Sequence, residues 1–373
     1  MRPALLLVLA ITLPAGSASG QSGGWMFGPF RKPAEVNPII SPRATSVFRS
    51  PIVDSVVRWE EYATFNPAAV VRGNEIVLLY RAEDASGEEM VGGHTSRLGF
   101  AESTDGFHFT RRPAPVLYPD TDAQRANEWP GGVEDPRVVE ADDGMYVLTY
   151  TQWNRDVPRL AVATSRDLLN WTKHGPAFAG AAKGKYLTHE SKSGAIVCRV
   201  RGDHLVAAKI DGKYWMYYGV PSVGIATSTD LVHWTPVEDA DGIPLHVLTP
   251  RPGYFDAWLV EAGAPAVITP RGILLMYNAG NDARYGDASL PTGVYTGGQA
   301  LFDLRNPLRL LARSTEPFIQ PTAEFERRGQ YKAGTTFVEG LVPFHGRWFL
   351  YYGTADARVG VAVWQPAART KVR

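Results

Sequence analysis

The chain has 373 residues, of which 45% are hydrophobic and 20% are charged. This composition allows a sizeable hydrophobic core and argues against a disordered protein. The 38 Lys and Arg residues equal the 38 Asp and Glu residues, so the chain lacks the basic surplus that nucleic-acid-binding proteins normally carry. Cys198 is the only cysteine. No internal disulfide can therefore form, and core packing has to hold the fold together.

The N-terminus has the pattern of a secretory signal peptide. Arg2 gives a positive start, residues 4–13 form an apolar run, and small residues follow. Such a run is too short to span a bilayer as a helix, whereas it suits a cleavable leader. We predict a signal peptide over residues 1–20, a secreted or periplasmic protein without a membrane span, and one catalytic domain over residues 21–373. The alternative is a buried N-terminal helix.

Five strand-like apolar runs recur along the rest of the chain. Each ends in a tyrosine and follows a turn signal that contains glycine, a residue that accepts the positive φ of tight hairpin turns. The runs are residues 76–80, 146–150, 214–218, 273–277 and 348–352. Five such units predict an all-β protein, a five-bladed β-propeller whose inner strands are these runs. A stack of β-sandwich domains is the alternative, but no Pro/Ser-rich linker interrupts the chain.

A second signature, Ala-x-Ser-x-Asp-x-x-x-aromatic, follows three of the runs. It begins at Ala101, Ala163 and Ala226, and weaker echoes at residues 299–303 and 360–363 complete the five units. Asp followed by Gly or Leu in this pattern predicts a turn between two outer strands.

Polar residues directly follow several of the runs. Because a propeller gathers its inner strands around one axis, we expect these side chains to converge in one funnel. They are Arg81, Glu83 and Asp84 after the first run, Asn278 and Asn281 after the fourth, and Asp356 and Arg358 after the fifth.

Residues 131–137, with the sequence GGVEDPR, contain the most suggestive pair of carboxylates. Glu134 and Asp135 are adjacent and are flanked by glycine and proline just before the second run. Hydrolysis of a glycoside needs at least one carboxylic acid to protonate the leaving oxygen. Taken alone, the segment is equally well interpreted as an ordinary loop with a local ion pair.

Four motifs occur in order at residues 65–68 (FNPA), 80–84 (YRAED), 96–99 (SRLG) and 132–137 (GVEDPR). Together they resemble glycoside hydrolase family 130, the β-mannoside phosphorylases and β-mannosidases, from about Ser55 to Trp364. The resemblance implies a mannose-containing oligosaccharide as substrate and Asp135 as the general acid, acting directly or through a sugar hydroxyl. It also implies that the mannose subsite is lined by Asn66, Arg81, Arg97, Glu134, Arg137 and Asp356.

The family divides between phosphate and water as the nucleophile, and this chain resembles the hydrolases. Glu261, in residues 253–263, stands where a base would activate water, and one carboxylate suffices for that task. Asn278, which we expect to bind substrate, stands where phosphorylases tend to have histidine, and residues 219–220 (GV) stand where we expect a phosphate-binding pair. A secreted enzyme also lacks a controlled phosphate pool. We therefore favour an inverting hydrolase of β-mannosides.

Two alternatives stay open. A β-mannoside phosphorylase would release mannose 1-phosphate and hold inorganic phosphate with basic residues among Lys183, Lys185, His189 and Lys192. A non-catalytic carbohydrate-binding propeller is less favoured, because both predicted catalytic carboxylates are present. No histidine pair has the spacing of metal ligands and no glycine-rich phosphate loop occurs, so we predict neither a metal nor another cofactor.

Overall fold

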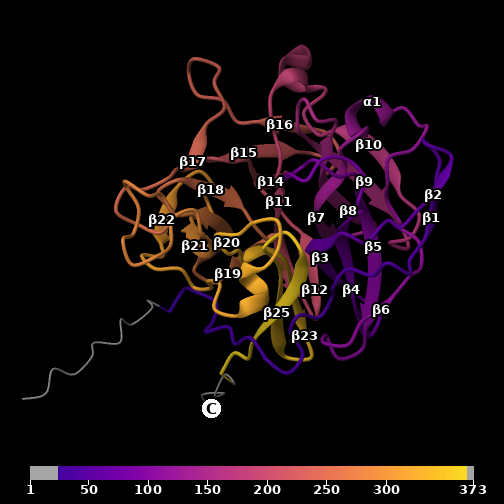
Figure 1. Ribbon diagram of the computed structural model, residues 1–373. Helices are drawn as coiled ribbons and strands as arrows, with labels where there is room; N and C mark the ends of the chain where they lie inside the picture. Colours follow the sequence, from indigo (N-terminus) through magenta and orange to yellow (C-terminus); the bar gives the residue numbers. More distant parts are fainter. Residues whose placement is uncertain (1–23, 368–373) are drawn as a thin grey trace, which may run out of the picture.

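The computed structural model describes residues 24–367, so the predicted signal peptide lies outside the described residues. Strands dominate the described chain, which confirms the all-β prediction (Figure 1). The helical elements are short: α1 (Arg125–Glu128), the 3₁₀ helix η1 (Ala181–Thr188) and the 3₁₀ helix η2 (Glu324–Arg327). Among residues 24–367, no helix has the length and apolar character needed to cross a membrane.

The strands form five consecutive antiparallel sheets, one for each predicted repeat, and a small hairpin precedes them. In the first two sheets each strand pairs with the next one along the chain. The hairpin is β1 (Phe48–Ser50) and β2 (Ser55–Val57); the first sheet is β3 (Ala63–Arg72), β4 (Glu75–Glu83), β5 (Ser96–Ser103) and β6 (Thr110–Arg111); the second is β7 (Gly132–Glu140), β8 (Tyr146–Trp153), β9 (Arg159–Ser165) and β10 (Thr172–Pro176).

The third and fourth sheets are less regular, because their first strands are interrupted. The third sheet is β11 (Ala195–Arg201), β12 (His204–Ala207), β13 (Lys209–Ile210), β14 (Lys213–Tyr218), β15 (Val223–Ser228), β16 (Trp234–Pro236) and β17 (His246–Leu248). The fourth is β18 (Leu259–Ala262), β19 (Ala266–Thr269), β20 (Gly272–Gly280), β21 (Tyr295–Phe302) and β22 (Leu310–Arg313). The fifth is β23 (Phe337–Phe344), β24 (Arg347–Thr354) and β25 (Arg358–Trp364).

The tyrosine-ending runs do not line the centre of the molecule, so that part of the sequence prediction is wrong. They form β4, β8, β14, β20 and β24, with a partner strand on either side. Each is the second strand of its sheet when the interrupted first strands, β11 with β13 and β18 with β19, are each counted as one. The first strands of neighbouring sheets meet instead, through parallel pairings such as β7 with β12 and β11 with β19. The reason is that the glycine turn before each run closes a hairpin with an earlier strand, and that earlier strand is innermost.

Hydrophobic residues of neighbouring sheets pack against one another and hold the sheets together. Leu79 and Leu148 join the first and second sheets in one cluster, whereas Ile225 and Leu275 join the third and fourth in another. Each fully buried side chain of this size contributes about 1.5–3 kcal/mol. The core is therefore distributed between the sheets, which leaves the ends of the innermost strands available for polar residues.

A buried cluster of tyrosine, carboxylate and cation recurs in four of the five sheets. We call it the tyrosine–acid cluster. A tyrosine from the second strand donates its hydroxyl to a fully buried carboxylate that also pairs with Lys or Arg. The members are Tyr80 with Glu60 and Arg111, Tyr150 with Glu128 and Lys173, Tyr277 with Asp256 and Arg313, and Tyr352 with Glu326 and Lys32; the four hydroxyl hydrogen bonds measure 2.7, 2.9, 2.8 and 2.8 Å, respectively.

The repeated Ser-x-Asp segments form turns, as predicted. In the first, the Asp105 carboxylate accepts hydrogen bonds from the backbone N–H groups of Phe107 and His108 at 2.8 and 2.9 Å. The same pattern occurs at Asp167 and Asp230. Such turns satisfy the backbone of a tight connection between strands.

The N-terminal segment completes the fifth sheet. Arg31 and Val363 exchange backbone hydrogen bonds of 2.8 Å, and Ile40 forms a second antiparallel bridge with Val359 of β25. Lys32 in the same segment pairs with Glu326 at 2.6 Å. The two ends of the described chain therefore lie in the same region (Figure 1).

Candidate active site

The first strands of four sheets contribute residues to one cavity of about 260 Å³. Asn66 comes from β3, Asp135 from β7, Glu261 from β18 and Phe337 from β23. Of the nine predicted site residues, six line this cavity: Asn66, Arg81, Glu134, Asp135, Glu261 and Asp356.

Local backbone irregularities turn two of these side chains toward each other. The pairing of β7 with β8 shifts register between Glu134 and Arg137, and Asp135 at this bulge has a left-handed φ of 45°. Asn66 lies at a similar register shift in β3 and has a φ of 43°. Left-handed backbone is uncommon outside glycine, but Asn and Asp tolerate it best. As a result, the Asn66 side-chain amide donates a hydrogen bond of 2.8 Å to Asp135 Oδ1.

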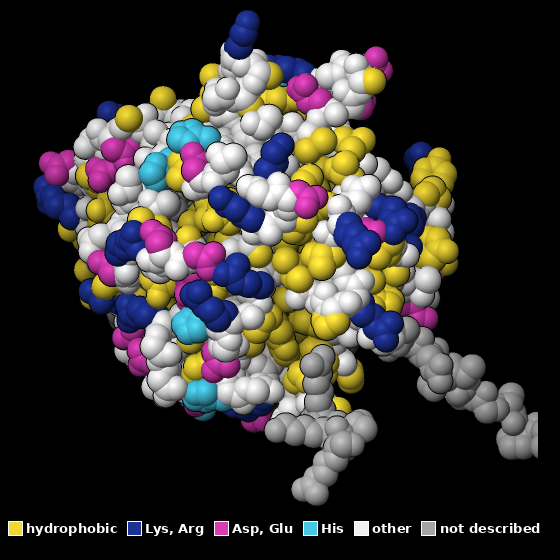
Figure 2. Space-filling view, turned by 180° about the vertical axis from the view of Figure 1, so that it is seen from behind, with side chains coloured by type: hydrophobic (Ala, Val, Ile, Leu, Met, Phe, Trp, Pro, Cys, Tyr) yellow, Lys and Arg dark blue, Asp and Glu magenta, His cyan; other side chains and the backbone are white. Residues whose placement is uncertain are grey.

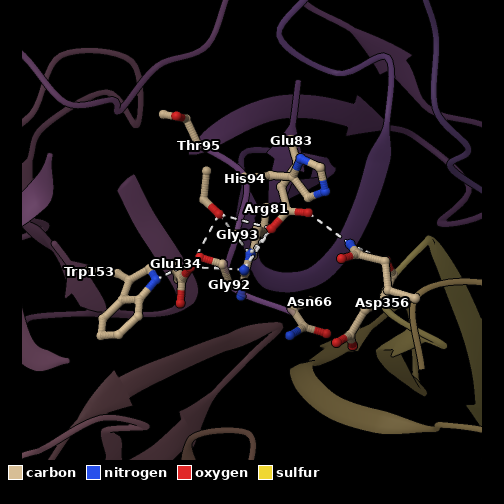
Figure 3. A network of polar contacts seen from close by, with 12 residues as sticks. Asn66, Arg81, Glu83, Gly92, Gly93, His94, Thr95, Glu134, Trp153 and Asp356 are labelled. Atoms are coloured by element: carbon tan, nitrogen blue, oxygen red, sulfur yellow. Dashed lines mark hydrogen bonds and ion pairs between the residues drawn. The ribbon is translucent and has the colours of Figure 1, made fainter. Parts of the chain in front are cut away.

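Arg81 organises the carboxylates on one side of the cavity. Its Nη1 lies 3.0 Å from Asp135 Oδ1, and its Nη2 lies 2.7 Å from Glu83 Oε1 and 2.8 Å from Glu134 Oε1. Figure 3 shows Arg81 between Glu83 and Glu134, with Asn66 and Asp356 on the other side of the same space. The planar guanidinium fixes the directions of its bonds, so one residue sets the positions of three acids.

The adjacent acids Glu134 and Asp135 have opposite protonation behaviour. Burial, followed by repulsion from Asp135 and Glu83, raises the pKa of Glu134 to about 7 against the attraction of Arg81. Burial alone would also raise the pKa of Asp135. The charges of Arg81 and Lys192 and the hydrogen bond from Asn66 outweigh burial and lower this pKa to about 2. The pair therefore keeps one proton up to about neutral pH, shared between two interacting groups.

Asp356 is a second acid in this cavity that holds a proton near neutral pH. Burial, together with repulsion from Asp135 and Glu83, raises its pKa to about 7 against the attraction of Arg81. Its backbone has a left-handed φ of 49°. Titratable groups with perturbed pKa values that gather in a cavity are typical of functional sites.

Glu261 lies across from Asp135, with Lys192 between them. Lys192 Nζ is 4.0 Å from Asp135 Oδ2 and 3.4 Å from Glu261 Oε1, so these two oxygens are at most 7.4 Å apart, the sum of the two distances. The Ser193 hydroxyl also donates to Glu261. Burial lowers the pKa of Lys192, but Glu261 and Asp135 raise it further, and the net shift is upward. Lys192 therefore stays charged.

Lys192 is the member of the predicted basic cluster that reaches the cavity. Lys183, Lys185 and His189 do not line it, and Lys185 pairs with Glu238 instead. Val220 lines a different cavity, described below.

Three predicted substrate-binding residues, Arg97, Arg137 and Asn278, are buried and do not line the cavity. Arg97 pairs with Asp84 at 2.7 Å. Asn278 bonds both the N–H and the carbonyl of Val338 and so joins the fourth and fifth sheets. The hydrogen-bonding groups of these side chains are used within the protein.

Arg137 connects the second sheet to its neighbours. Its guanidinium donates hydrogen bonds of 2.9 Å to the carbonyls of Gly263, Ala262 and Asp135, and pairs with Glu339 at 2.8 Å. Glu339 is fully buried, and burial raises its pKa well above the usual range. The sequence analysis did not single out Glu339, and it supports the backbone of Asp135 through Arg137.

Aromatic side chains form part of the cavity wall and were not predicted. Trp153 ends β8, Tyr295 begins β21, Phe337 begins β23, and Tyr331 lies in the preceding loop. Aromatic residues are common throughout this chain, so composition alone does not separate wall residues from core residues. Their faces suit the C–H surfaces of a sugar. Within residues 24–367, no group of three or more His, Cys, Asp or Glu side chains is arranged to hold a metal ion.

Comparisons with known proteins identify the family of the chain. Residues 31–368 match the family model described as beta-1,4-mannooligosaccharide phosphorylase, glycoside hydrolase family 130. A 1,2-beta-oligomannan phosphorylase of Thermoanaerobacter sp. (strain X514) is 32% identical over 330 residues, which cover 87% of this chain and 94% of that protein.

Two solved structures are more similar to this chain. A glycosyl hydrolase from Bacteroides ovatus is 53% identical, with a TM-score of 0.90, covering 92% of this chain and 95% of that one. The other structure was reported with the finding that the family of mannoside phosphorylases contains glycoside hydrolases that target beta-1,2 mannosidic linkages in Candida mannan. It is 51% identical, with a TM-score of 0.91, and covers 92% of this chain and 95% of that one. The protein described here therefore belongs to glycoside hydrolase family 130 and is an enzyme that acts on mannosides.

Proposed function

We propose that this protein is a secreted, inverting β-mannosidase built as a five-bladed β-propeller. The five consecutive sheets, with their first strands meeting at the centre, support the propeller. The leader-like sequence of residues 1–20 is the basis for proposing secretion.

The charge of the cavity is the observation that carries hydrolysis over phosphorolysis. Four carboxyl groups line it, Glu134, Asp135, Glu261 and Asp356, against two cations, Arg81 and Lys192. Because Glu134 and Asp356 hold protons up to about neutral pH, the two remaining acids balance the two cations. A phosphate ion needs an excess of donors and positive charge, which this cavity lacks, whereas water is neutral and needs no such excess.

Asp135 and Glu261 divide the acid and base work in this proposal. The proton held by the Glu134–Asp135 pair passes through Asp135 to the glycosidic oxygen, directly or through a sugar hydroxyl, as the C–O bond breaks. Glu261 accepts a proton from water as the water oxygen bonds to the anomeric carbon. Inverting enzymes hold their two carboxyl groups about 6.5–9.5 Å apart, and the upper limit of 7.4 Å for these oxygens is compatible with the lower part of that range.

The substrate we propose is a β-1,2-linked mannooligosaccharide. Its terminal mannose lies against Asn66, Arg81 and Asp356, which face one part of the cavity. The linkage follows two relatives, a 1,2-beta-oligomannan phosphorylase with 32% identity and a structure reported with family hydrolases that target beta-1,2 mannosidic linkages, with 51% identity.

Phosphorolysis is the second candidate, and Lys192 is the observation in its favour. This cation reaches the space between Asp135 and Glu261, where a phosphate oxygen would approach the sugar.

Product analysis on β-1,2-mannobiose with and without phosphate distinguishes hydrolysis from phosphorolysis. We expect free mannose in both cases, released first as the α-anomer by NMR. Mannose 1-phosphate formed only with phosphate would establish phosphorolysis, and first release of the β-anomer would contradict inversion.

Glu261→Gln tests the base. We expect at least a 100-fold loss of kcat on β-1,2-mannobiose, because general-base catalysis typically contributes about 10²–10⁴-fold. The affinity for mannose, measured by calorimetry, should stay within about threefold. Ser193→Ala is the matched control, since it removes a hydroxyl that donates to Glu261 but keeps the carboxylate; its loss should be smaller. A Glu261→Gln enzyme with normal kcat would exclude this role.

A further inference from the structure

The third sheet lacks the tyrosine–acid cluster of the other four sheets. Tyr218 ends β14, and it lies opposite Gly224 of β15 in the same way that Tyr80 lies opposite Gly99. Its hydroxyl nevertheless forms no hydrogen bond with a carboxylate within residues 24–367, and burial, followed by the nearby Tyr186 and Glu238, raises its pKa. The repeat is therefore preserved in its backbone but changed in its polar groups.

The difference originates in the residues just before the first strand. Glu60 and Asp256 lie three residues before β3 and β18, respectively, and Glu128 lies four residues before β7. At the same two places before β11 the third sheet has Lys192 and Ser191. The nearest preceding acid, Glu190, lies five residues before β11 and lines the same cavity as Tyr218, but it forms no hydrogen bond with the tyrosine hydroxyl within the described chain.

A cavity of about 120 Å³ occupies this region, and we call it the third-sheet cavity. It has room for a group much larger than a water molecule. Phe178, Tyr186, His189, Tyr218, Ser222 and His246 are among its lining residues. It lies beside two projections, formed by η1 and by the loop between β16 and β17 (Figure 1), and these stand apart at the top of Figure 2.

The third-sheet cavity adjoins the active-site cavity. Ser191 lines the first and its neighbour Lys192 lines the second. Gly219, also in the wall of the third-sheet cavity, donates a backbone hydrogen bond of 2.8 Å to the carbonyl of Lys192. The residue that lies between the proposed acid and base is therefore also part of the boundary between the two cavities.

The lining has the chemistry of a sugar subsite. Phe178 and Tyr218 pack with ring centroids 4.7 Å apart, and aromatic faces suit the C–H surface of a pyranose. The Tyr218 hydroxyl, the Ser222 hydroxyl and the two imidazoles supply donors and acceptors for sugar hydroxyls. We propose that the third-sheet cavity holds a further sugar unit of the oligomannoside whose terminal mannose lies in the active-site cavity. This inference rests on the proposed function.

Two variants test the subsite over substrates of increasing length. Ser222→Trp fills the cavity, and no side-chain hydrogen bond of Ser222 is lost within the described chain. Tyr218→Phe removes only the unpartnered hydroxyl. We expect kcat/KM of Ser222→Trp to fall at least tenfold for those β-1,2-mannooligosaccharides that are long enough to reach the third-sheet cavity. For methyl β-mannoside, which is too short to reach it, kcat/KM should change less than twofold. Tyr218→Phe should lose about 2- to 10-fold on the same long substrates, the effect of one hydrogen bond.

Ala123→Trp is the matched control, because it adds the same side chain to a surface hollow that the active-site residues do not line. It should leave every substrate unchanged. Equal losses on methyl β-mannoside and on the long substrates, or no loss on any of them, would overturn the subsite.

Binding of β-1,2-mannotriose, measured by calorimetry, tests the subsite independently of the proposed reaction. We expect Ser222→Trp to bind it at least tenfold more weakly than the wild type does. If the wild type binds mannotriose without cleaving it, the hydrolase proposal fails while the weaker binding still supports the subsite. If the wild type cleaves mannotriose and both proteins bind it equally, the subsite alone is excluded.

Discussion

Buried carboxylates occur in two regions of this molecule, and the regions hold them differently. In the tyrosine–acid clusters, each acid is closed off from solvent and has its own tyrosine hydroxyl and at least one cation. In the active-site cavity, four acids share Arg81 and Lys192 and face open space. Burial of an acid therefore does not by itself indicate function. What distinguishes the cavity is a shortage of positive charge next to a space that a substrate can enter.

This comparison predicts that substitutions in the cavity change the rate, whereas substitutions in the clusters change stability. The largest effect belongs to Asp135→Asn. Asparagine tolerates the left-handed backbone of this position, so the fold should persist while the acid is lost. We expect kcat on β-1,2-mannobiose to fall about 10²–10⁴-fold, with a melting temperature no lower than that of the wild type. Near-normal turnover would exclude Asp135 as the acid.

Asp256→Asn should lower the stability of the protein and leave its rate of catalysis nearly unchanged. Asp256 is fully buried and pairs with Arg313 at 2.6 Å and Arg251 at 2.8 Å. Removing one partner of a buried pair typically costs about 3–5 kcal/mol, and we expect about 3 because Arg251 is partly exposed. Urea unfolding measures the loss, and kcat at 25 °C should stay within twofold. An unchanged free energy of unfolding would mean that the cluster does not stabilise its sheet.

Tyr277→Phe and Tyr218→Phe form a matched pair in two sheets. The Tyr277 hydroxyl donates to the buried Asp256, and hydrogen bonds to charged groups contribute about 1.5–3 kcal/mol. Tyr218 has no such partner. We expect a loss of about 2 kcal/mol in the free energy of unfolding for the first variant and less than about 0.5 for the second. Equal losses would remove the distinction between the third sheet and the fourth.

The smallest predicted effect depends on pH. The pKa of Asp356 is raised to about 7 in the folded protein, so between about pH 4 and pH 7 the folded state binds more protons than the unfolded state. Stability then falls as the pH rises through this window. Asp356→Asn should therefore raise the melting temperature at pH 8 by the equivalent of about 1 kcal/mol, and should leave it nearly unchanged at about pH 4. The same increase at both pH values would show that titration of Asp356 is not the cause.

The sequence predicted the repeats and all four acids of the cavity, because both leave local patterns. Glycine turns and tyrosine-ending runs indicate hairpins, and the GVEDPR segment places two carboxylates together. Which strand of a hairpin is innermost depends on contacts between sheets, so this assignment was wrong. Arg97 and Arg137, which the resemblance places in the mannose subsite, do not line the cavity, for a similar reason. Their guanidinium groups are taken up by Asp84 and by carbonyls of another sheet, and such partners are far away along the chain.

The tyrosine–acid clusters were accessible to sequence reasoning but were not recognised. Each acid lies 20 to 26 residues before its tyrosine, a regular spacing once the tyrosines are aligned. The third repeat breaks it, since Lys192 lies 26 residues before Tyr218. The third repeat, where the acid is missing from this spacing, is therefore also the repeat that contains Lys192 and the third-sheet cavity.

The pairing of the N-terminal segment with β25 bears on the order in which the molecule can be assembled. Residues 31–40 supply the outer partner of β25, so this early segment cannot complete its pairing until the much later β25 has been synthesised. Until then the outer edge of β25 is unpaired, and such edges attract other chains. The fifth sheet thus contains both the first and the last segments of the described chain, and removal of residues 24–42 would leave the outer edge of β25 unpaired and open to other chains.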